Sequence, residues 1–320
     1  MEDLTSIAFL LRPTFTMKFN SRFTSRRHWL TRTSLMGACF GVASLFSLGV
    51  VQSEDKKKNV LFYNRSAGFE HSVVHRDGDA PSHAERVMKE FAKKYNFDVT
   101  CTKDGTVFEK DYDKFDAFVF YTTEDLTQPG GDNQPPMSEQ GKKNFLEAVA
   151  KGKGFVGSHC ASDTFHSPGD RTKKSAEVDP YIQMLGGEFI RHGRQQNATM
   201  RVTSRSFPGA EKAGEKFDLH EEWYSLKNFA PDMHVILVQE TKGMQDADYD
   251  RPPYPATWAR KHGEGRVFYT SMGHREDVWT NATFESIFMG GLLWALKEVD
   301  ADIPGNIQDV TPEASVLPKL

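Results

Sequence analysis

The sequence is poor in cysteine, with three in 320 residues. Cys39 falls within the first fifty residues, whose composition differs from the rest, so only Cys101 and Cys160 remain for the folded part. Two cysteines do not make a disulfide framework, and the fold must therefore depend on a hydrophobic core. Both lie in apolar, strand-like contexts, which is typical of buried free thiols.

A surplus of positive charge is also missing. The chain carries 40 basic and 44 acidic residues, a formal net charge of -4 at pH 7. The first 53 residues hold six of the basic and two of the acidic side chains, so the remainder is more acidic than the whole. We therefore expect neither nucleic acid nor an anionic membrane surface as a partner.

An apolar run of clear membrane-spanning length is lacking too. Residues 35–51 are borderline against the roughly 20 residues that a span needs, and they contain several glycines and serines. Because Arg26 and Arg27 precede this run, the layout predicts a signal peptide over residues 1–53 and favours the twin-arginine route. Met17 is a candidate for the true start. We expect a bacterial protein that is periplasmic or secreted; the alternative is an uncleaved signal, which would be its one attachment to a membrane.

Strand and helix patterns alternate in the first half of the remaining chain. Apolar runs predict strands at residues 59–63, 97–101, 115–121 and 154–159. Helical spacing predicts helices at residues 80–95, with Ser82 as the N-cap, and at 138–150. This alternation is typical of βαβ units, so we predict an α/β fold, a three-layer sandwich with a mainly parallel central sheet.

The second half is less regular. We expect a short helix at residues 181–185, strands at 199–202 and 234–238, and a final helix at about 283–298. Residues 256–260 and 266–270 flank Gly263-Glu264-Gly265, which predicts a hairpin. The domain is predicted to span residues 54–302, followed by an extended C-terminal tail at 303–320.

Three histidines each follow a separate predicted strand. His71 comes after the first strand, His159 ends the strand at 154–159, and His274 follows the last apolar strand. Because sites form at the carboxyl ends of strands in open α/β sheets, we expect the three to converge. A surface loop histidine is the alternative for His71, and a core histidine bonded to the backbone is the alternative for His159, although the polar residues after His159 favour a site. No pair has a diagnostic spacing such as His-Glu-x-x-His, so a divalent metal remains an open alternative.

Two carboxylates accompany these histidines. Asp163 follows His159 and could fix its tautomer, contact a substrate hydroxyl or simply cap a helix. In the run at residues 218–224, alternate positions of an extended segment would place Asp218, His220 and Glu222 on one face. Glu222 could then serve acid/base chemistry or bind a metal, and the alternative is a solvated acidic strand.

The frame Gly157-x-His159-x-Ala161 resembles a nucleophile elbow, in which a sharp strand-to-helix turn exposes one side chain. A histidine occupies the place of the nucleophile. Cys160 lies one residue later, and on a tight turn it would point elsewhere.

Several motifs in order resemble the ThuA-like (trehalose utilisation) family, whose domain is similar to class I glutamine amidotransferases. The resemblance covers roughly residues 59–299. It rests on Gly68-Phe69-Glu70-His71, Gly154-Phe155-Val156-Gly157-Ser158-His159 with Asp163-Thr164, Leu185-Gly186-Gly187-Glu188-Phe189, Glu222-Trp223-Tyr224, Pro255-Ala256-Thr257-Trp258 and the segment at residues 265–274.

The resemblance implies a flavodoxin-like or amidotransferase-like sheet between helices, and a protein that processes a carbohydrate, either a disaccharide or a keto-sugar. His71, His159 and His274 would be acid/base or ligand groups, with Glu222 as their partner, in a hydrolase or lyase acting on a glycoside. The aromatic residues Trp223, Tyr224 and Trp258 are candidate sugar platforms, although each could simply be core.

The amidotransferase reaction needs a cysteine at the elbow, and His159 stands there, so we expect no glutaminase activity. A non-catalytic carbohydrate-binding module on a degenerate enzyme fold is the alternative function. The sequence leaves open whether the chain forms a homo-oligomer.

Overall fold

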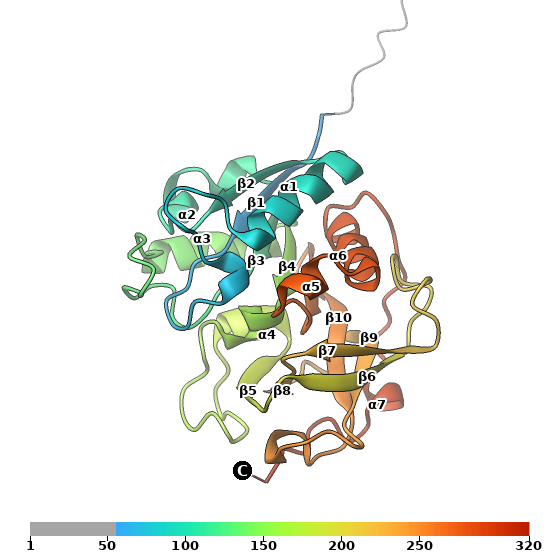
Figure 1. Cartoon of the computed structure of the whole chain (residues 1–320). Coiled ribbons are helices and arrows are strands. Elements are labelled where there is room, and N and C mark those ends of the chain that lie inside the picture. The colour runs from blue at the N-terminus through green and yellow to red at the C-terminus, as the bar shows by residue number, and fades with distance from the viewer. Residues whose placement is uncertain (1–55, 320) are drawn as a thin grey trace, which may run out of the picture. The chain divides into compact units, whose positions relative to one another are not determined.

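The fold is built on a nine-stranded mixed sheet with the strand order β2-β1-β3-β4-β11-β10-β9-β6-β7 (Figure 1). A computed structural model describes residues 56–319, and the predicted signal peptide lies outside these described residues. The strands of the large sheet are β1 (Asn59–Tyr63), β2 (Asp98–Thr102), β3 (Ala117–Phe120), β4 (Gly154–Ser158), β6 (Gln196–Val202), β7 (Lys216–Glu221), β9 (His234–Glu240), β10 (Tyr254–His262) and β11 (Gly265–Thr270).

The half of the sheet formed by β2, β1, β3, β4 and β11 is parallel. Its inner strands are covered on both faces, and every residue of β3 is fully buried. The predicted three-layer α/β sandwich is confirmed in this half. Helices α1 (His83–Tyr95), α5 (Glu276–Trp279) and α6 (Ala282–Ala295) cover one face, and α2 (Val107–Lys110), α3 (Glu139–Ala150) and α4 (Pro180–Leu185) cover the other (Figure 1).

The other half of the sheet is antiparallel, so the sheet is mixed where the sequence predicts a mainly parallel one. The change occurs at the predicted hairpin between β10 and β11. Gly263 adopts φ +58 there, and a Cβ atom on it would lie 2.4 Å from the carbonyl oxygen of Ala150. A tight turn of this kind reverses the chain, whereas a parallel connection needs a long crossover. A separate two-stranded sheet pairs β5 (Glu188–His192) with β8 (Tyr224–Lys227).

The N-terminus of α1 fixes the loop that follows β1. Ser82 Oγ accepts the backbone N–H of Glu85, and the Glu85 carboxylate accepts the backbone N–H of Ser82, so the predicted N-cap is a complete capping box. The same carboxylate accepts a hydrogen bond from Asn64 Nδ2, 3.1 Å away, and pairs with Arg76. Since Asn64 follows β1 and Arg76 precedes α1, Glu85 ties together both ends of the loop that carries His71.

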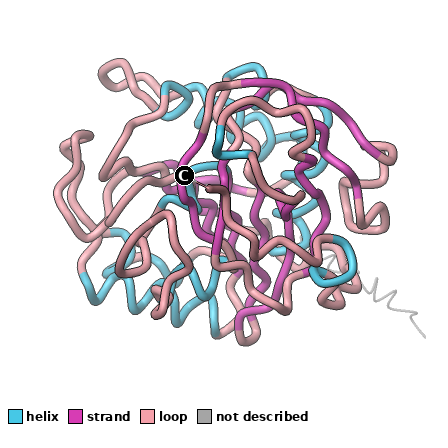
Figure 2. Tube along the Cα trace, turned by 90° about the horizontal axis from the view of Figure 1, so that it is seen from below, coloured by secondary structure: helices cyan, strands magenta, loops and turns pink. Residues whose placement is uncertain are grey.

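The C-terminal segment packs against the antiparallel half. It contains the short helix α7 (Ile307–Val310) where the sequence predicts only an extended tail. Arg251, which is buried, donates from Nη2 to the carbonyl oxygen of Ala314 at 2.7 Å, and Arg201 donates to that of Val310 at 3.1 Å. The orthogonal view of Figure 2 shows the strands running through the middle of the domain with helices on both sides. Within residues 56–319, no helix has the length and apolar character needed to cross a membrane.

Candidate functional site

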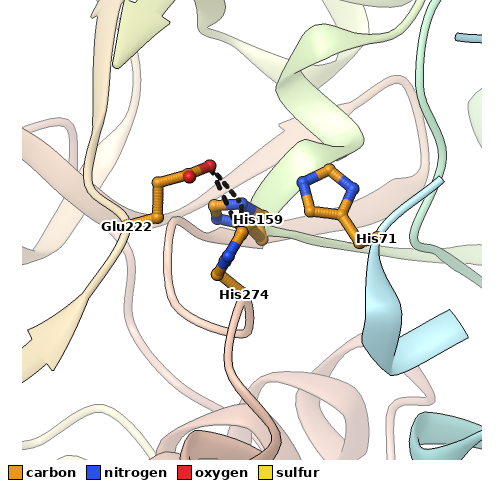
Figure 3. Close-up of side chains that lie close together, drawn as sticks. All are labelled: His71, His159, Glu222 and His274. Atoms are coloured by element: carbon orange, nitrogen blue, oxygen red, sulfur yellow. Dashed lines mark hydrogen bonds and ion pairs between the residues drawn. The ribbon is translucent and has the colours of Figure 1, made fainter. Parts of the chain in front are cut away.

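Four of the predicted site residues come together at the carboxyl edge of the sheet (Figure 3). His159 follows β4 directly, His71 and His274 lie in the loops after β1 and β11, and Glu222 follows β7. One ligand atom from each of the four lies within 4.8 Å of the others. Three of them thus come from the parallel half of the sheet, and the carboxylate arrives from the antiparallel half.

His159 sits on a strained turn. Its φ is +46, in the left-handed region that costs a non-glycine residue about 1–2 kcal/mol. The hydroxyl of Tyr269 donates to its carbonyl oxygen at 2.8 Å, and its own Nδ1 donates to the carbonyl oxygen of Ser271 at 3.0 Å. With the proton on Nδ1, the lone pair of Nε2 is free and faces the other site residues. The turn is sharp, as in a nucleophile elbow, and it presents an imidazole nitrogen.

His274 is positioned through its backbone. The buried carboxylate of Glu221 accepts the N–H groups of Gly273 at 3.0 Å and His274 at 3.2 Å. Burial raises the pKa of Glu221 to about 7, although the backbone N–H groups of Gly273 and Glu222 act in the opposite direction. Gly273 adopts φ +122, and a Cβ atom on it would lie 2.6 Å from Ser158 Oγ, so this close approach requires glycine.

Three of the four ligand atoms form a nearly regular triangle. Nε2 of His159 lies 3.3 Å from Nδ1 of His274, and Oε1 of Glu222 lies 3.6 Å from the first nitrogen and 3.3 Å from the second. A tetrahedral ion with bonds of 2.0–2.1 Å separates its ligands by about 3.3–3.4 Å. The triangle therefore has the dimensions of one face of a tetrahedral zinc-type site.

His71 stands beside this triangle. Its ring centroid lies 5.2 Å from those of both His159 and His274, and it meets both rings edge-on. Its Nε2 lies 3.5 Å from the hydroxyl of Tyr224, and its buried Nδ1 has no hydrogen-bond partner within residues 56–319. His71 is thus either a fourth ligand or a group beside the position left open by the other three.

The charges of the site suit a cation. Burial lowers the pKa of His159, and burial together with the neighbouring His159 lowers that of His71 well below the usual value. Burial alone would raise the pKa of Glu222 and lower that of His274. The hydrogen bonds between the carboxylate and the imidazoles outweigh it, so the pKa of Glu222 is lowered and that of His274 raised. An ionised carboxylate with imidazoles is the donor set of zinc and of several other divalent transition metals. His159 and His71 have lowered pKa values and favour the neutral form, whereas His274, with its raised pKa, would release its proton when an ion binds.

Asp163 does not fix the tautomer of His159, as the sequence had allowed. The carbonyl of Ser271 does so, and Asp163 instead lies 2.6 Å from Nε2 of His166. Nδ1 of His166 lies 3.4 Å from Glu188, and the two carboxylates outweigh burial to raise the pKa of His166 to about 9. Asp163 thus belongs to a second, neighbouring group that also contains Glu124.

Two of the three predicted aromatic platforms are core residues. Trp223 and Trp258 are fully buried, and their indole N–H groups donate to the carbonyl oxygens of Gln196 and Leu185. Neither ring can offer a face to a ligand. Tyr224 is also buried, but it lines the site, because its ring centroid lies 4.1 Å from that of His159.

The shared face predicted for the acidic run at residues 218–224 is not present. Asp218 and His220 are exposed on the edge strand, whereas Glu222 is buried. The alternation stops because β7 ends at Glu221 and the chain then turns toward β8.

Several residues of the site region were not predicted as site residues. His192, the last residue of β5, has Nδ1 3.5 Å from Oε2 of Glu222. Gln195 contacts Nε2 of His274 at 2.9 Å. Glu221 adjoins Glu222 in the same acidic run, but nothing in the sequence separates its role from that of its neighbours. The ring of Phe69 lies 5.0 Å from that of His71, and the position of Phe69 in the motif Gly68-Phe69-Glu70-His71 after β1 is the signal that could have identified it.

Comparisons of this chain with a protein-family model and with solved structures agree with the fold described above. The family model described as "Trehalose utilisation" (ThuA) matches residues 59–295. A ThuA-like protein from Bacteroides uniformis is similar in structure, with a TM-score of 0.54, 18% sequence identity, and 75% of this chain and 91% of that chain covered. One from Parabacteroides merdae has a TM-score of 0.50 and 18% identity, with 78% and 95% covered. A comparison with curated protein sequences gives no match. The family model spans most of the sequence, and the chain belongs to the ThuA family.

Proposed function

We propose that this protein is a metal-dependent hydrolase or lyase that acts on a carbohydrate, either a disaccharide or a keto-sugar. The observation that carries the proposal is the triangle of His159 Nε2, His274 Nδ1 and Glu222 Oε1, with sides of 3.3 to 3.6 Å. These three residues would hold a divalent ion. The description of the family as trehalose utilisation supports a sugar as the substrate.

A bound divalent ion supplies Lewis acidity toward a carbonyl or hydroxyl oxygen. The chain itself supplies groups that can move a proton. His71 is neutral, lies edge-on to two ligand residues, and is placed to act as general base or general acid. The hydroxyl of Tyr224, 3.5 Å from Nε2 of His71, can hydrogen-bond this imidazole or a sugar oxygen, and burial raises the pKa of Tyr224 well above its usual value, so the phenol keeps its proton.

Metal content is the first test of this proposal. Metal analysis of the purified protein should find one divalent ion per chain. His159→Ala, Glu222→Gln and His274→Ala should each lose it, because each removes one corner of the triangle. His220→Ala is the matched control, since His220 is exposed on β7 away from the site, and it should keep the ion. Loss of the ion from His220→Ala as well, or its retention in all three site variants, would exclude this ligand set.

Turnover is the second test. Metal-loaded protein should release glucose from trehalose or from its 3-keto derivative, and His71→Ala should lower kcat while the ion stays bound. If the sugars bind but none is turned over, and His71→Ala and His159→Ala leave the binding unchanged, the chain is a carbohydrate-binding module instead.

Glutaminase activity is not part of the proposal. The Cys160 side chain is fully buried, and burial raises the pKa of its thiol well above the usual value, so it cannot supply a thiolate nucleophile. Cys160→Ser should therefore keep full turnover. Loss of turnover in a folded, metal-loaded Cys160→Ser protein would point to thiol chemistry.

We further propose that the protein is exported to the periplasm. This proposal rests on the arginine pair and the apolar run within residues 1–53.

A further inference from the structure

Phe69 is held out in water next to the candidate site. It is 70% exposed, and among the described residues the other large hydrophobic side chain of this kind is Val316, at 46%. A single exposed apolar side chain needs no explanation by itself. Phe69 differs from an ordinary surface residue in three respects: how firmly its backbone is fixed, what its ring touches, and which charged groups lie against its loop.

The backbone around Phe69 is fixed on both sides. Thr123 Oγ1 donates to the carbonyl oxygen of Phe69 at 3.0 Å, and Thr123 Oγ1 in turn accepts a hydrogen bond from the N–H of Gly68 at 3.3 Å. The next residue, Glu70, is bound by Lys103 and lies 2.7 Å from Nδ1 of His75. The exposed ring is therefore carried by a rigid segment.

The ring of Phe69 touches the candidate site directly. Its centroid lies 5.0 Å from that of His71, with the two planes at 89°. His71 in turn lies 5.2 Å from His159 and His274. A sugar that stacks on Phe69 would thus lie near His71, whose ring contacts two residues of the triangle.

A pair of charged groups, Glu124 and Arg171, lies against the same loop at Gly68. Gly68 abuts Glu124 so closely that a Cβ atom on Gly68 would lie 2.3 Å from Glu124 Cγ. Both carboxylate oxygens of Glu124 accept from Nη2 of Arg171 at 2.8 Å, and the two side chains are 39% and 41% exposed. A pyranose ring has an apolar C–H face and a rim of hydroxyls. An aromatic ring beside an accessible carboxylate and guanidinium can bind both parts.

We propose that Phe69 is the stacking platform for a pyranose ring of the substrate, and that Glu124 and Arg171 bind hydroxyls of the same sugar. The inference rests on the proposed function for the catalytic step that follows sugar binding, since the bond acted on would lie toward His71. Binding on Phe69 itself needs no metal. Sugar contact with the ring therefore can be tested separately from catalysis.

Phe69→Ala and Phe69→Trp test the platform. Isothermal titration measures the affinities, with methyl α-D-glucopyranoside for the metal-loaded protein and with trehalose after the ion has been removed, so that turnover adds no heat. Phe69→Ala should weaken binding by about tenfold or more, because the stacking surface is gone. Phe69→Trp should bind at least as well as the wild type, and its indole fluorescence should change as the sugar saturates. Val316→Ala removes the other exposed apolar side chain and should bind like the wild type.

The outcomes separate the platform from the proposed function. Equal sugar affinity of Phe69→Ala and the wild type overturns the platform, whether or not the protein binds metal and turns over sugar. A Phe69→Trp signal that ignores saturating sugar does the same, and so does a wild type that binds neither sugar. Conversely, if sugar binding depends on Phe69 but the protein takes up no metal, the proposal for Phe69 stands and the proposed metal-dependent function is wrong.

Discussion

The carboxylate of Glu221 accepts the backbone N–H of His274 at 3.2 Å, although the two residues are 53 positions apart in the chain. Glu221 ends β7, at the edge of the antiparallel half, and His274 follows β11 in the parallel half. The contact fixes the loop that carries one corner of the ligand triangle. Glu221 touches neither the proposed ion nor the substrate, so it is a positioning residue.

Glu221→Gln should lower zinc affinity by about tenfold to a hundredfold, the usual range when a residue that orients a metal ligand is altered. The amide keeps the shape of the carboxylate but loses its charge, and it can turn an N–H toward the N–H groups of Gly273 and His274. Competition with a chromophoric chelator measures the affinity. Asp218→Asn, an exposed change on the same strand, should have no effect. Equal zinc affinity in Glu221→Gln and Asp218→Asn would mean that the contact does not matter for the site.

Gly273→Ala should destabilise the protein more than Gly243→Ala does. Both glycines have positive φ, +122 and +90, but a Cβ at 273 meets Ser158 Oγ at 2.6 Å, whereas one at 243 meets nothing within 4 Å. We expect about 1 kcal/mol for the backbone conformation alone and about 2–4 kcal/mol where overpacking adds to it. Urea unfolding of both variants measures the difference. If the two losses of stability are the same, the close approach of the loop to β4 is not a packing constraint.

The contacts of His166 with the carboxylates of Asp163 and Glu188 predict that the stability of the protein depends on pH. The pKa of His166 rises from 6.5 in the unfolded chain to about 9 in the folded one, so its contribution is fully present below pH 6.5 and is lost as the pH rises through 9. The pKa of Glu188 falls from 4.5 to about 2, so its contribution is lost as the pH falls from 4.5 toward 2. We expect up to about 3 kcal/mol from His166.

The comparison that checks this prediction is urea unfolding of the wild type and His166→Gln at several pH values. The difference in unfolding free energy should be largest near pH 5–6.5 and should shrink steadily up to pH 9. His220→Gln, which removes an exposed histidine on β7, serves as the control. A difference that stays constant over this range would show that His166 is not charged by its neighbours.

Trp258→Phe should affect stability and leave sugar binding alone. The substitution removes the 2.8 Å hydrogen bond to the carbonyl oxygen of Leu185 and opens a space beside Gly187, where a Cβ atom would lie 2.7 Å from the indole. We expect a loss of about 1–3 kcal/mol, measured by thermal or urea unfolding, with unchanged affinity for trehalose. If Trp258→Phe binds sugar more weakly but keeps normal stability, Trp258 would be a sugar platform after all, despite its full burial.

Local sequence signals predicted most of the parallel half. Continuous apolar runs predicted buried strands, such as the one at residues 154–159 that forms β4, and Ser82 marked the start of α1. Such signals are local, because capping and burial depend on neighbours in the chain. The antiparallel half was predicted less well. Its strands pair with partners far along the chain, and only the β10–β11 hairpin has a local turn signal.

The sequence by itself determined that His71, His159 and His274 meet, because residues that follow parallel strands share one edge of the sheet. Only the tertiary structure decided the rest. It turned Glu222 inward where β7 ends, buried Trp223 and Trp258, assigned Asp163 to His166, and left Phe69 in water beside His71. Each of these depends on contacts between the two halves of the sheet or between separate loops, and such contacts leave no periodic pattern in the sequence.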